Sequence, residues 1–340
     1  MNDRPAKAGE AEIIELLTRG MIRDDRGVVL GAGDDCAILA SGDGRVTLIT
    51  TDMQIEGTHF QTKYTLPQEL GRRALAINLS DIAAMGGTPR HAFLALSLPD
   101  EVAETSFFEG LRQGMASVAE EFEVNLLGGD LARSRSGIGI TLTVIGEADA
   151  DKVLLRSGAW PGDYIYVTGT LGDAAAGLEL LQQGSGLSRR GPLERAQLMP
   201  SARIREGQFL SGCGWVHACI DLSDGLSTDL SHLCARSKVG ARVFEDEIPV
   251  SAEFLQHING DAGRKLNLAC HGGEDYELCF TAACKHGSEL ERAFAERFQT
   301  RLTRIGEIRD EPKEIELVGR LGSVRFLARG HDHFAKPRGA

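Results

Sequence analysis

The sequence predicts an α+β fold made of two domains, each combining a mixed sheet with helices. At 340 residues the chain is longer than one ordinary hydrophobic core supports, so two domains are expected. Both halves alternate helical and strand-like patterns, with strand pairs that look antiparallel. A loop rich in Gly and Pro, RSGAWPGD at 156–163, lies between the two halves. We therefore expect an N-terminal domain over residues 1–149 and a C-terminal domain over residues 150–340.

In the N-terminal half, apolar residues in adjacent pairs at helical spacing predict a short amphipathic helix over 11–22. Longer helices are expected at 68–85 and 103–122. Strand-like runs lie between them: VTLITTD (46–52), HAFLALSL (91–98), VNLLGG (124–129) and GIGITLTVIGEA (137–148).

The helix expected at 68–85 has two distinct faces. Asn78 and Asp81 are three residues apart, so their side chains share one face. A core stripe on another face is formed by Leu75, Leu79 and Ile82.

In the C-terminal half, a strand (YIYVTG) leads into a helix (DAAAGLELLQQ), and the polar, Gly-rich stretch 184–193 is expected to be a flexible insertion. The run ACIDLSDGLSTDLSHLCARS predicts a strand, a turn and a helix. Further strands, with helices between them, are expected around 241–248, 276–282, 301–308, 314–319 and 323–328.

Composition narrows the functional class. Hydrophobic residues make up 42% and charged residues 25%, as in an ordinary globular protein. The net charge of −12 argues against nucleic acid or a membrane surface as partner, since either would require a basic patch. No apolar run approaches the length of a membrane span, and the N-terminus lacks the layout of a secretion signal, so a cytoplasmic location is expected. The seven cysteines show no C-x-x-C or zinc spacing, which predicts reduced, buried thiols.

Common nucleotide-binding motifs are missing. There is no G-x-x-x-x-G-K-[ST] sequence, which excludes a P-loop. The glycines at 31 and 33 continue into Asp34 and Asp35 instead of G-x-G-x-x-G, so a Rossmann dinucleotide site is not expected. The H-R-D and D-F-G motifs of protein kinases are absent as well.

Several carboxylates lie at the end of an apolar run or just before a glycine turn, where solubility needs no charge. A carboxylate at such an edge is costly to desolvate unless something compensates it. Without matching Lys or Arg nearby, the set suggests hard cations, because Mg²⁺ and Ca²⁺ take oxygen ligands. We therefore expect a multi-metal carboxylate site holding a phosphorylated ligand. Its candidates are Asp34, Asp35, Asp52, Asp81, Asp130, Asp221 and Asp224.

Taken singly, these motifs have structural alternatives. Thr50, Thr51 and Asp52 close a strand and could cap a loop, and Asp224 could be the N-cap of the following helix. For Asp81 a functional role is favoured over a structural one, because Asp is unfavourable in the interior of a helix. The closing His-Asp-His at 331–333 could bind a transition metal, but a polar tail packing on a cleft is the favoured interpretation.

Taken in order, the motifs resemble those of the thiamine-monophosphate kinase family, in the aminoimidazole ribonucleotide synthetase superfamily. They run from about residue 31 to 334. The resemblance implies two mixed α/β-sandwich domains of the aminoimidazole ribonucleotide synthetase type, forming a homodimer with ATP and several Mg²⁺ in a cleft framed by both domains. The segments that carry it are GAGDDCAIL, TTDMQIEGTHF, ALAINLSDIAAMGGTPR, LLGGD, LLRSGAWPGDYIYVTGTLGD, IDLSDGL, GGEDYELCF and DHF.

The resemblance also implies roles for individual residues. The magnesium positions are Asp35, Thr50, Thr51, Asp52, Asp81, Asp130, Asp221 and Asp224. The ATP contacts are Gly129, Asp130, Arg156 and Ser223. The thiamine phosphate contacts are His59, Glu274 and Phe334. No general acid or base is implied, and Asp130 and Asp221 are the most critical positions. The chain departs from the family pattern at Leu131, often Thr, and at His331, usually Tyr.

The activity implied is ATP-dependent phosphorylation of thiamine monophosphate to thiamine diphosphate, the last step of thiamine diphosphate biosynthesis, by direct in-line, Mg-assisted transfer. The N-terminal domain would bind ATP and Mg²⁺ and form the dimer, and the C-terminal domain would complete the nucleotide and substrate sites. Arg156 suits the phosphates of ATP because a guanidinium group matches phosphate oxygens. The thiazolium ring of the substrate is cationic, so Glu274 and the aromatic face of Phe334 suit it.

Two alternatives remain. Another ATP-dependent member of the superfamily, such as an amidine-ring synthetase or a selenophosphate synthetase, would share most motifs. Selenophosphate enzymes use a reactive Cys or selenocysteine with Lys in a glycine-rich N-terminal segment, whereas residues 1–30 contain no Cys, and Lys7 lies outside any such run. A non-catalytic Mg-nucleotide-binding protein is disfavoured because the metal, nucleotide and substrate motifs are all present.

Overall fold

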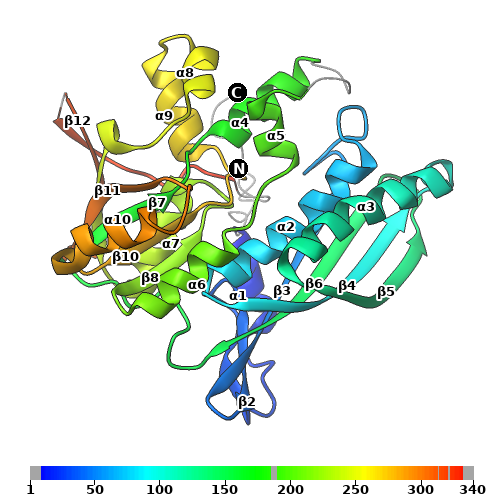
Figure 1. Ribbon diagram of the computed structural model, residues 1–340, viewed down its shortest axis with the longest axis horizontal. Coiled ribbons are helices and arrows are strands. Elements are labelled where there is room, and N and C mark those ends of the chain that lie inside the picture. Colours follow the sequence, from blue (N-terminus) through cyan, green and yellow to red (C-terminus); the bar gives the residue numbers. More distant parts are fainter. Residues whose placement is uncertain (1–8, 185–189, 313, 321, 332–340) are drawn as a thin grey trace, which may run out of the picture.

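The computed structural model describes residues 9–184, 190–312, 314–320 and 322–331, which form two parts lying side by side (Figure 1). Each part is built on one mixed β-sheet with helices packed against it. The predicted α+β class with two mixed sheets is therefore confirmed.

The N-terminal sheet has six strands in the order β1-β2-β3-β6-β4-β5. All neighbours are antiparallel except β4 and β5, which run parallel. The sequence patterns did not predict β1 and β2, which are short and flank the glycine turn before Asp35. The strands are β1 (Val28–Leu30), β2 (Ala37–Gly42), β3 (Arg45–Ile55), β4 (Thr88–Leu98), β5 (Asn125–Arg133) and β6 (Gly139–Asp149).

Two long helices, α2 (Pro67–Ala84) and α3 (Thr105–Phe122), cover one face of this sheet (Figure 1). The predicted core stripe of α2 is confirmed, since Leu75, Leu79 and Ile82 are all buried. The helices approach closely at Gly71, where an added Cβ would lie 2.0 Å from the Leu111 carbonyl oxygen. The first helix, α1 (Glu10–Thr18), is shorter than expected because Gly20 adopts φ +68°, which ends a helix.

The C-terminal sheet has seven strands in the order β13-β12-β9-β11-β7-β10-β8, and only the β12–β9 pair is parallel. Helices lie on both of its faces, so all of β10 is buried. The strands are β7 (Tyr164–Thr168), β8 (Val216–Asp221), β9 (Gly240–Phe244), β10 (Leu278–Ala282), β11 (Leu302–Arg309), β12 (Ile315–Gly319) and β13 (Gly322–Arg325). The helices are α4 (Asp173–Gln182), α5 (Pro192–Leu198), α6 (Ile204–Cys213), α7 (Leu226–Ser237), α8 (Ala252–Ile258), α9 (Ala262–His271) and α10 (Gly287–Ala295).

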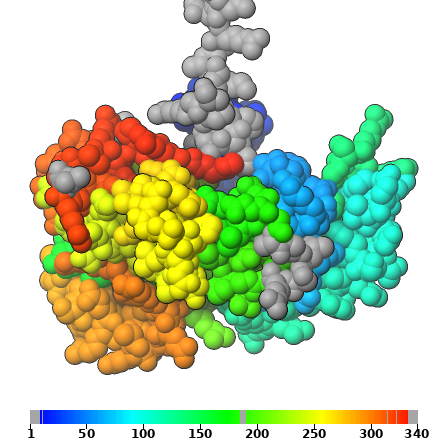
Figure 2. Space-filling view, turned by 90° about the horizontal axis from the view of Figure 1, so that it is seen from above, coloured from blue at the N-terminus to red at the C-terminus, as the bar shows by residue number. Residues whose placement is uncertain are grey.

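The two parts share a continuous hydrophobic core, which runs from the N-terminal sheet through α2 and α6 to one face of the C-terminal sheet. The contact is tight, because an added Cβ at Gly207 of α6 would lie 2.1 Å from the Ala83 carbonyl oxygen in α2. Figure 2 shows α4 and α5 (green) beside α8 and α9 (yellow), next to the N-terminal part. Helix α2 therefore faces both sheets, and this position organises the site.

Part of the predicted insertion at 184–193, residues 185–189, lies outside the described residues. Residues 190–193 are held by specific contacts and are not a flexible loop. Arg190 donates to the Glu69 carboxylate and the Tyr64 carbonyl, and α5 begins at Pro192. The seven cysteines form no disulfide, and five of them are buried, whereas Cys284 is exposed. Among the helices that the structure describes, none combines the length and apolar character needed to cross a membrane.

Candidate active site

Three carboxylates from both parts of the molecule meet at one point. Asp35 lies in the loop before β2, Asp81 near the end of α2, and Asp221 at the end of β8. Each offers an oxygen atom, and these atoms all lie within 4.8 Å of one another. Asp35 and Asp221 are buried. We call these three residues the carboxylate cluster.

Local structure explains why the cluster forms. Gly33 adopts φ +116°, a conformation that favours glycine, and this turn delivers Asp35 to the buried side. Helix α2 carries Asp81 and also Ser80, whose hydroxyl donates to Asp221 over 2.7 Å. The Thr50 hydroxyl in β3 donates to Asp81. Neighbouring hydroxyls thus hold two of the three carboxylates in place.

One guanidinium group lies against the cluster. Arg156 Nε donates to Asp35 Oδ1 over 3.1 Å, while Asp35 Oδ2 is buried and has no hydrogen-bond partner. Burial, and then the charge of Asp35, raise the pKa of Asp221 to about 8. Burial, and then Asp52, raise the pKa of Asp81 well above its ordinary value. Ionising all three carboxylates would thus place more negative charge here than one arginine compensates.

A hard divalent cation fits this donor set. The cluster offers only oxygen ligands, which Mg²⁺ prefers. Asp35 Oδ2 is buried without a hydrogen-bond donor, so a bound cation would compensate its charge. The Thr50 hydroxyl, which donates to Asp81, adds a further oxygen atom beside the cluster. The chemistry of the residues thus agrees with the prediction that Asp35, Asp81 and Asp221 bind metal.

Asp52 and Thr51 follow Thr50 in β3 but differ in environment. The Asp52 backbone N–H donates to Asn78 Oδ1 of α2 over 3.1 Å. Burial raises the pKa of Asp52 to about 6, with smaller contributions from Glu10 and Asp35. Asp52 is therefore part of the same electrostatic site. Thr51 is exposed, and its hydroxyl donates to the Leu142 carbonyl of β6.

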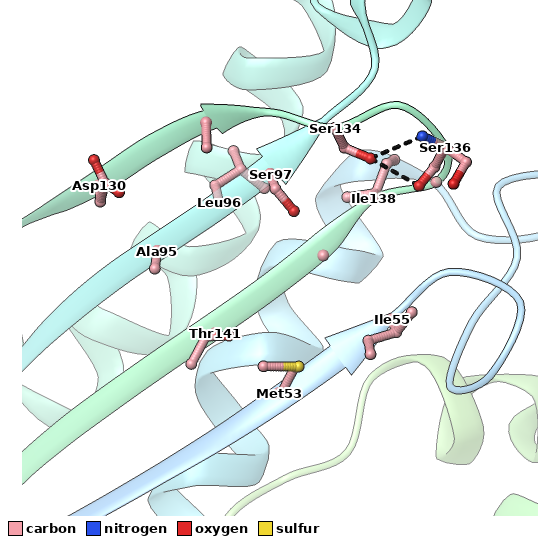
Figure 3. A pocket seen from close by; sticks show the side chains of 13 residues that line it. Met53, Ile55, Ala95, Leu96, Ser97, Asp130, Ser134, Ser136, Ile138 and Thr141 are labelled. Atoms are coloured by element: carbon pink, nitrogen blue, oxygen red, sulfur yellow. Dashed lines mark hydrogen bonds between the residues drawn. The ribbon is translucent and has the colours of Figure 1, made fainter.

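Gly129 and Asp130 lie on β5, an exposed edge strand. Gly129 adopts φ +155°, and an added Cβ would lie 1.6 Å from the Leu94 carbonyl oxygen, so only glycine fits there. Asp130 lines a shallow pocket together with Met53 and Thr141 (Figure 3). Strands β4 and β6 separate β5 from β3, a distance of roughly 14 Å at the usual strand spacing. Within a single chain, Asp130 does not join the carboxylate cluster.

The loop after β8 carries Ser223 and Asp224. The N-cap of α7 is Gly225, not Asp224, so the N-cap alternative for Asp224 is wrong. The carboxylate of Asp229 accepts instead from the backbone N–H groups of Asp224 (3.1 Å) and Gly225 (2.9 Å). The Ser223 carbonyl accepts from the Glu274 N–H over 2.8 Å, so a predicted ATP contact and a predicted substrate contact are neighbours.

Glu274 is held from behind by two residues that the sequence did not identify. Arg73 of α2 donates to Glu274 Oε1, and Gln197 of α5 donates to Glu274 Oε2. Arg73 is only 2% exposed and also donates to the Gln197 carbonyl. The sequence did contain a signal for Arg73: it is a charged residue on the buried face of the helix GRRALAINL, where an arginine needs a partner.

The remaining predicted contacts are partly described. His59 is half-buried after β3, and its Nδ1 accepts from the Ile55 N–H over 3.0 Å. Phe334 lies outside the described residues, as do the Asp and second His of the closing motif. The His331 N–H donates to the Asp224 carbonyl over 3.2 Å, so this segment packs against the loop after β8.

Asp34 was a candidate carboxylate that the resemblance leaves out of the magnesium positions, and in the structure it supports the loop beside the cluster. Its carboxylate accepts from the backbone N–H of Arg156 over 3.2 Å and from that of Asp35 over 3.1 Å. Burial, and then the Asp35 charge, raise its pKa to about 6. Asp34 thus fixes the backbone from which Arg156 reaches the cluster.

Comparison with known proteins gives consistent matches over most of the chain. Residues 33–148 match the family AIR synthase related protein, N-terminal domain, and residues 161–318 match the corresponding C-terminal domain family. The thiamine-monophosphate kinase of Salmonella typhimurium is 39% identical over 91% of this chain and 93% of its own length. That of Bacillus subtilis is 31% identical over 96% and 99%.

Solved structures agree with these matches. A thiamine-monophosphate kinase from Stenotrophomonas maltophilia has a TM-score of 0.75 at 37% identity, covering 90% of this chain and 95% of its own. AaThiL complexed with AMPPCP and TMP has a TM-score of 0.82 at 30% identity, covering 96% and 97%. The hydrogenase maturation protein HypE, at 20% identity and a TM-score of 0.70, shares the fold.

Proposed function

The chain belongs to the thiamine-monophosphate kinase family and is thus an ATP-dependent kinase of thiamine monophosphate, and we propose that it works by direct, in-line transfer assisted by several Mg²⁺ ions. The observation that supports this mechanism is the carboxylate cluster, in which three carboxylates from both parts of the molecule come close enough to bind a shared metal ion. The product would be thiamine diphosphate, formed together with ADP.

The chemistry explains why carboxylates would suffice without a general base. The acceptor is a phosphate monoester with a second pKa of about 6, so its oxygen is already an anionic nucleophile at neutral pH. The obstacle is repulsion, since two like charges 4 Å apart cost about 4 kcal/mol at an effective dielectric constant of 20. Bound Mg²⁺ would neutralise and align the two phosphate groups. Asp35, Asp81 and Asp221 would hold it, with Asp52 and the Thr50 hydroxyl beside them.

The other predicted contacts complete the proposal. Thr51, Asp130 and Asp224 remain proposed metal positions, and Gly129, Asp130 and Ser223 remain proposed ATP contacts. His59, Glu274 and Phe334 remain proposed contacts of thiamine phosphate. We also propose that residues 1–149 bind ATP and Mg²⁺ and form the dimer, and that residues 150–340 complete both substrate sites.

Arg156 has a dual role in this account. In the free protein its guanidinium neutralises Asp35; with metal and ATP bound it would donate to the phosphates. We expect Arg156→Met to raise the KM for ATP at least tenfold, because a charge-assisted hydrogen bond is lost. Steady-state kinetics with varied ATP checks this, with Arg242→Met, a partly exposed arginine of β9, as control. An unchanged KM for ATP would remove Arg156 from the nucleotide site.

We propose that the exposed face of the N-terminal sheet forms the homodimer. Its outer surface presents Met53, Ile55 and Phe93, all exposed. An apolar surface of this kind marks an interaction site. Asp130 lies on this face, so the dimer would place it at the interface (Figure 3).

Phe93→Asp is expected to convert the dimer into a monomer, because a charge would be buried at the interface. Light scattering after size exclusion should give twice 36.6 kDa for the wild type and 36.6 kDa for the variant. The control is Val324→Asp, a more exposed apolar residue on β13 of the other sheet, which should remain dimeric. A monomeric wild type at micromolar concentration would contradict the proposal.

The activity is tested by incubating the protein with ATP, Mg²⁺ and thiamine monophosphate and separating the products. We expect thiamine diphosphate and ADP in equal amounts, and no labelled phosphate on the protein when γ-labelled ATP is used. Unphosphorylated thiamine should not be an acceptor, because it lacks the anionic oxygen. Absence of turnover, or label trapped on the protein, would contradict the proposal.

A further inference from the structure

One face of α2 carries two different contacts. Arg73 and Ser80 are seven residues apart, which places them on the same face, about 10.5 Å apart along the helix axis. Ser80 donates to Asp221 in the carboxylate cluster, and Arg73 donates to Glu274. A single rigid helix therefore connects the cluster with the loop that carries Glu274.

The contacts around Glu274 form a layered arrangement. Arg73 and Gln197 are 2% and 3% exposed, whereas the Glu274 side chain is 25% exposed. Each carboxylate oxygen of Glu274 accepts one hydrogen bond from behind, and a carboxylate has about four lone-pair sites. Lone pairs on the exposed edge are thus left for a further donor or cation. Two buried polar atoms next to Glu274, Arg73 Nε and Gln197 Oε1, have no partner.

The backbone of this loop is held in a rare conformation. Glu274 has φ +72° and Tyr276 has φ +51°, values that non-glycine residues seldom adopt. Such strain persists only where the surroundings fix it, and it gathers at ligand-binding sites. Here the Glu274 and Tyr276 N–H groups donate to the carbonyls of Ser223 and Leu222 in the loop after β8. Arg73 and Gln197 fix the Glu274 side chain in the same way.

We propose that Arg73 and Gln197 are positioning residues that hold Glu274 for the ring end of thiamine phosphate. The substrate then lies along α2, with its phosphate at the carboxylate cluster and its amino and cationic ring atoms at the exposed edge of Glu274. This inference rests on the proposed function and adds two residues that act through Glu274. Since Arg73 neutralises Glu274, the ring is recognised by the fixed orientation of the carboxylate and not by net charge alone.

Gln197→Met tests the proposal, because it removes the hydrogen bond to Glu274 at nearly constant volume. We expect the KM for thiamine phosphate and the inhibition constant of thiamine, which has the rings but no phosphate, to rise together at least tenfold. The KM for ATP should stay within twofold. Arg73→Met should act in the same direction, and Arg73→Lys, which keeps the charge, should recover part of the loss.

Arg203→Lys is the matched control. Arg203 forms a partly buried ion pair with Glu277, so its replacement disturbs a comparable ion pair that does not hold Glu274. It should lower thermal stability and leave both KM values unchanged. Unshifted constants for thiamine phosphate and thiamine in Gln197→Met, or an equal rise in the KM for ATP, would overturn the positioning role. A wild-type protein without turnover would instead refute the proposed function itself.

Discussion

Asp221→Asn is expected to abolish phosphoryl transfer while making the metal-free protein more stable. Asp221 is buried beside Asp35, and these surroundings raise its pKa to about 8. Ionised Asp221 therefore opposes folding when no metal is bound, and an amide removes that charge. The Ser80 hydroxyl can still donate to the amide oxygen. The same change removes a proposed metal ligand, so function and stability should move in opposite directions.

We expect kcat/KM to fall about a thousandfold, equivalent to about 4 kcal/mol of transition-state stabilisation. In EDTA at pH 8, the free energy of unfolding should rise by several kcal/mol, because the amide removes a buried charge whose cost is about 1.4 kcal/mol for each unit of pKa shift. Urea unfolding and steady-state kinetics measure the two effects. The control is Asp149→Asn, which changes an exposed carboxylate of β6. It should have little effect on kcat/KM or on the free energy of unfolding. A variant that is active, or less stable in EDTA, would contradict this role for Asp221.

Magnesium is expected to stabilise the protein, and to do so more strongly as the pH rises. The folded-state pKa values of Asp52 (about 6) and Asp221 (about 8) both lie above the ordinary value of 3.8. At a pH between 3.8 and the folded-state pKa of each group, that carboxyl group is protonated in the folded state and ionised in the unfolded state. In the metal-free protein, these groups therefore favour folding below about pH 4, and their contribution is lost as the pH rises to 8.

Metal binding reverses this trend, because Mg²⁺ competes with protons for the same oxygens. At a hundredfold excess over its dissociation constant, a ligand stabilises the folded state by about 2.7 kcal/mol. The melting temperature, measured with and without Mg²⁺ from pH 5.5 to 8.5, should show a gain that grows with pH. In Asp221→Asn the gain should be smaller and flatter. A gain independent of pH in the wild type would contradict metal binding at the cluster.

Local patterns predicted the elements that position the cluster. The buried stripe of Leu75, Leu79 and Ile82 follows from helical spacing, and it turns Asp81 toward the site. Asp35 and Asp221 were identified because each lies at an abrupt edge of an apolar run. Chemistry that is visible over a few residues was therefore accessible from the sequence.

Long-range pairing was not accessible in the same way. Arg73 lies 201 positions from Glu274 and 124 from Gln197, and no local pattern pairs them. The sequence also did not predict on which face of the sheet Asp130 lies. A register shift between Ala92 and Phe93 marks a bulge near the glycines of β5, and one extra residue reverses which side chains face outward.

The central claim is that the carboxylate cluster holds divalent cations between two phosphate-bearing substrates. Phosphorus NMR relaxation with Mn²⁺ in place of Mg²⁺ tests it directly, using a non-hydrolysable ATP analogue and thiamine monophosphate together. The account predicts strong paramagnetic relaxation of both the γ-phosphorus of the analogue and the phosphorus of thiamine monophosphate, and loss of both effects in Asp221→Asn. Relaxation of the analogue alone, with thiamine monophosphate bound but unaffected, would contradict it.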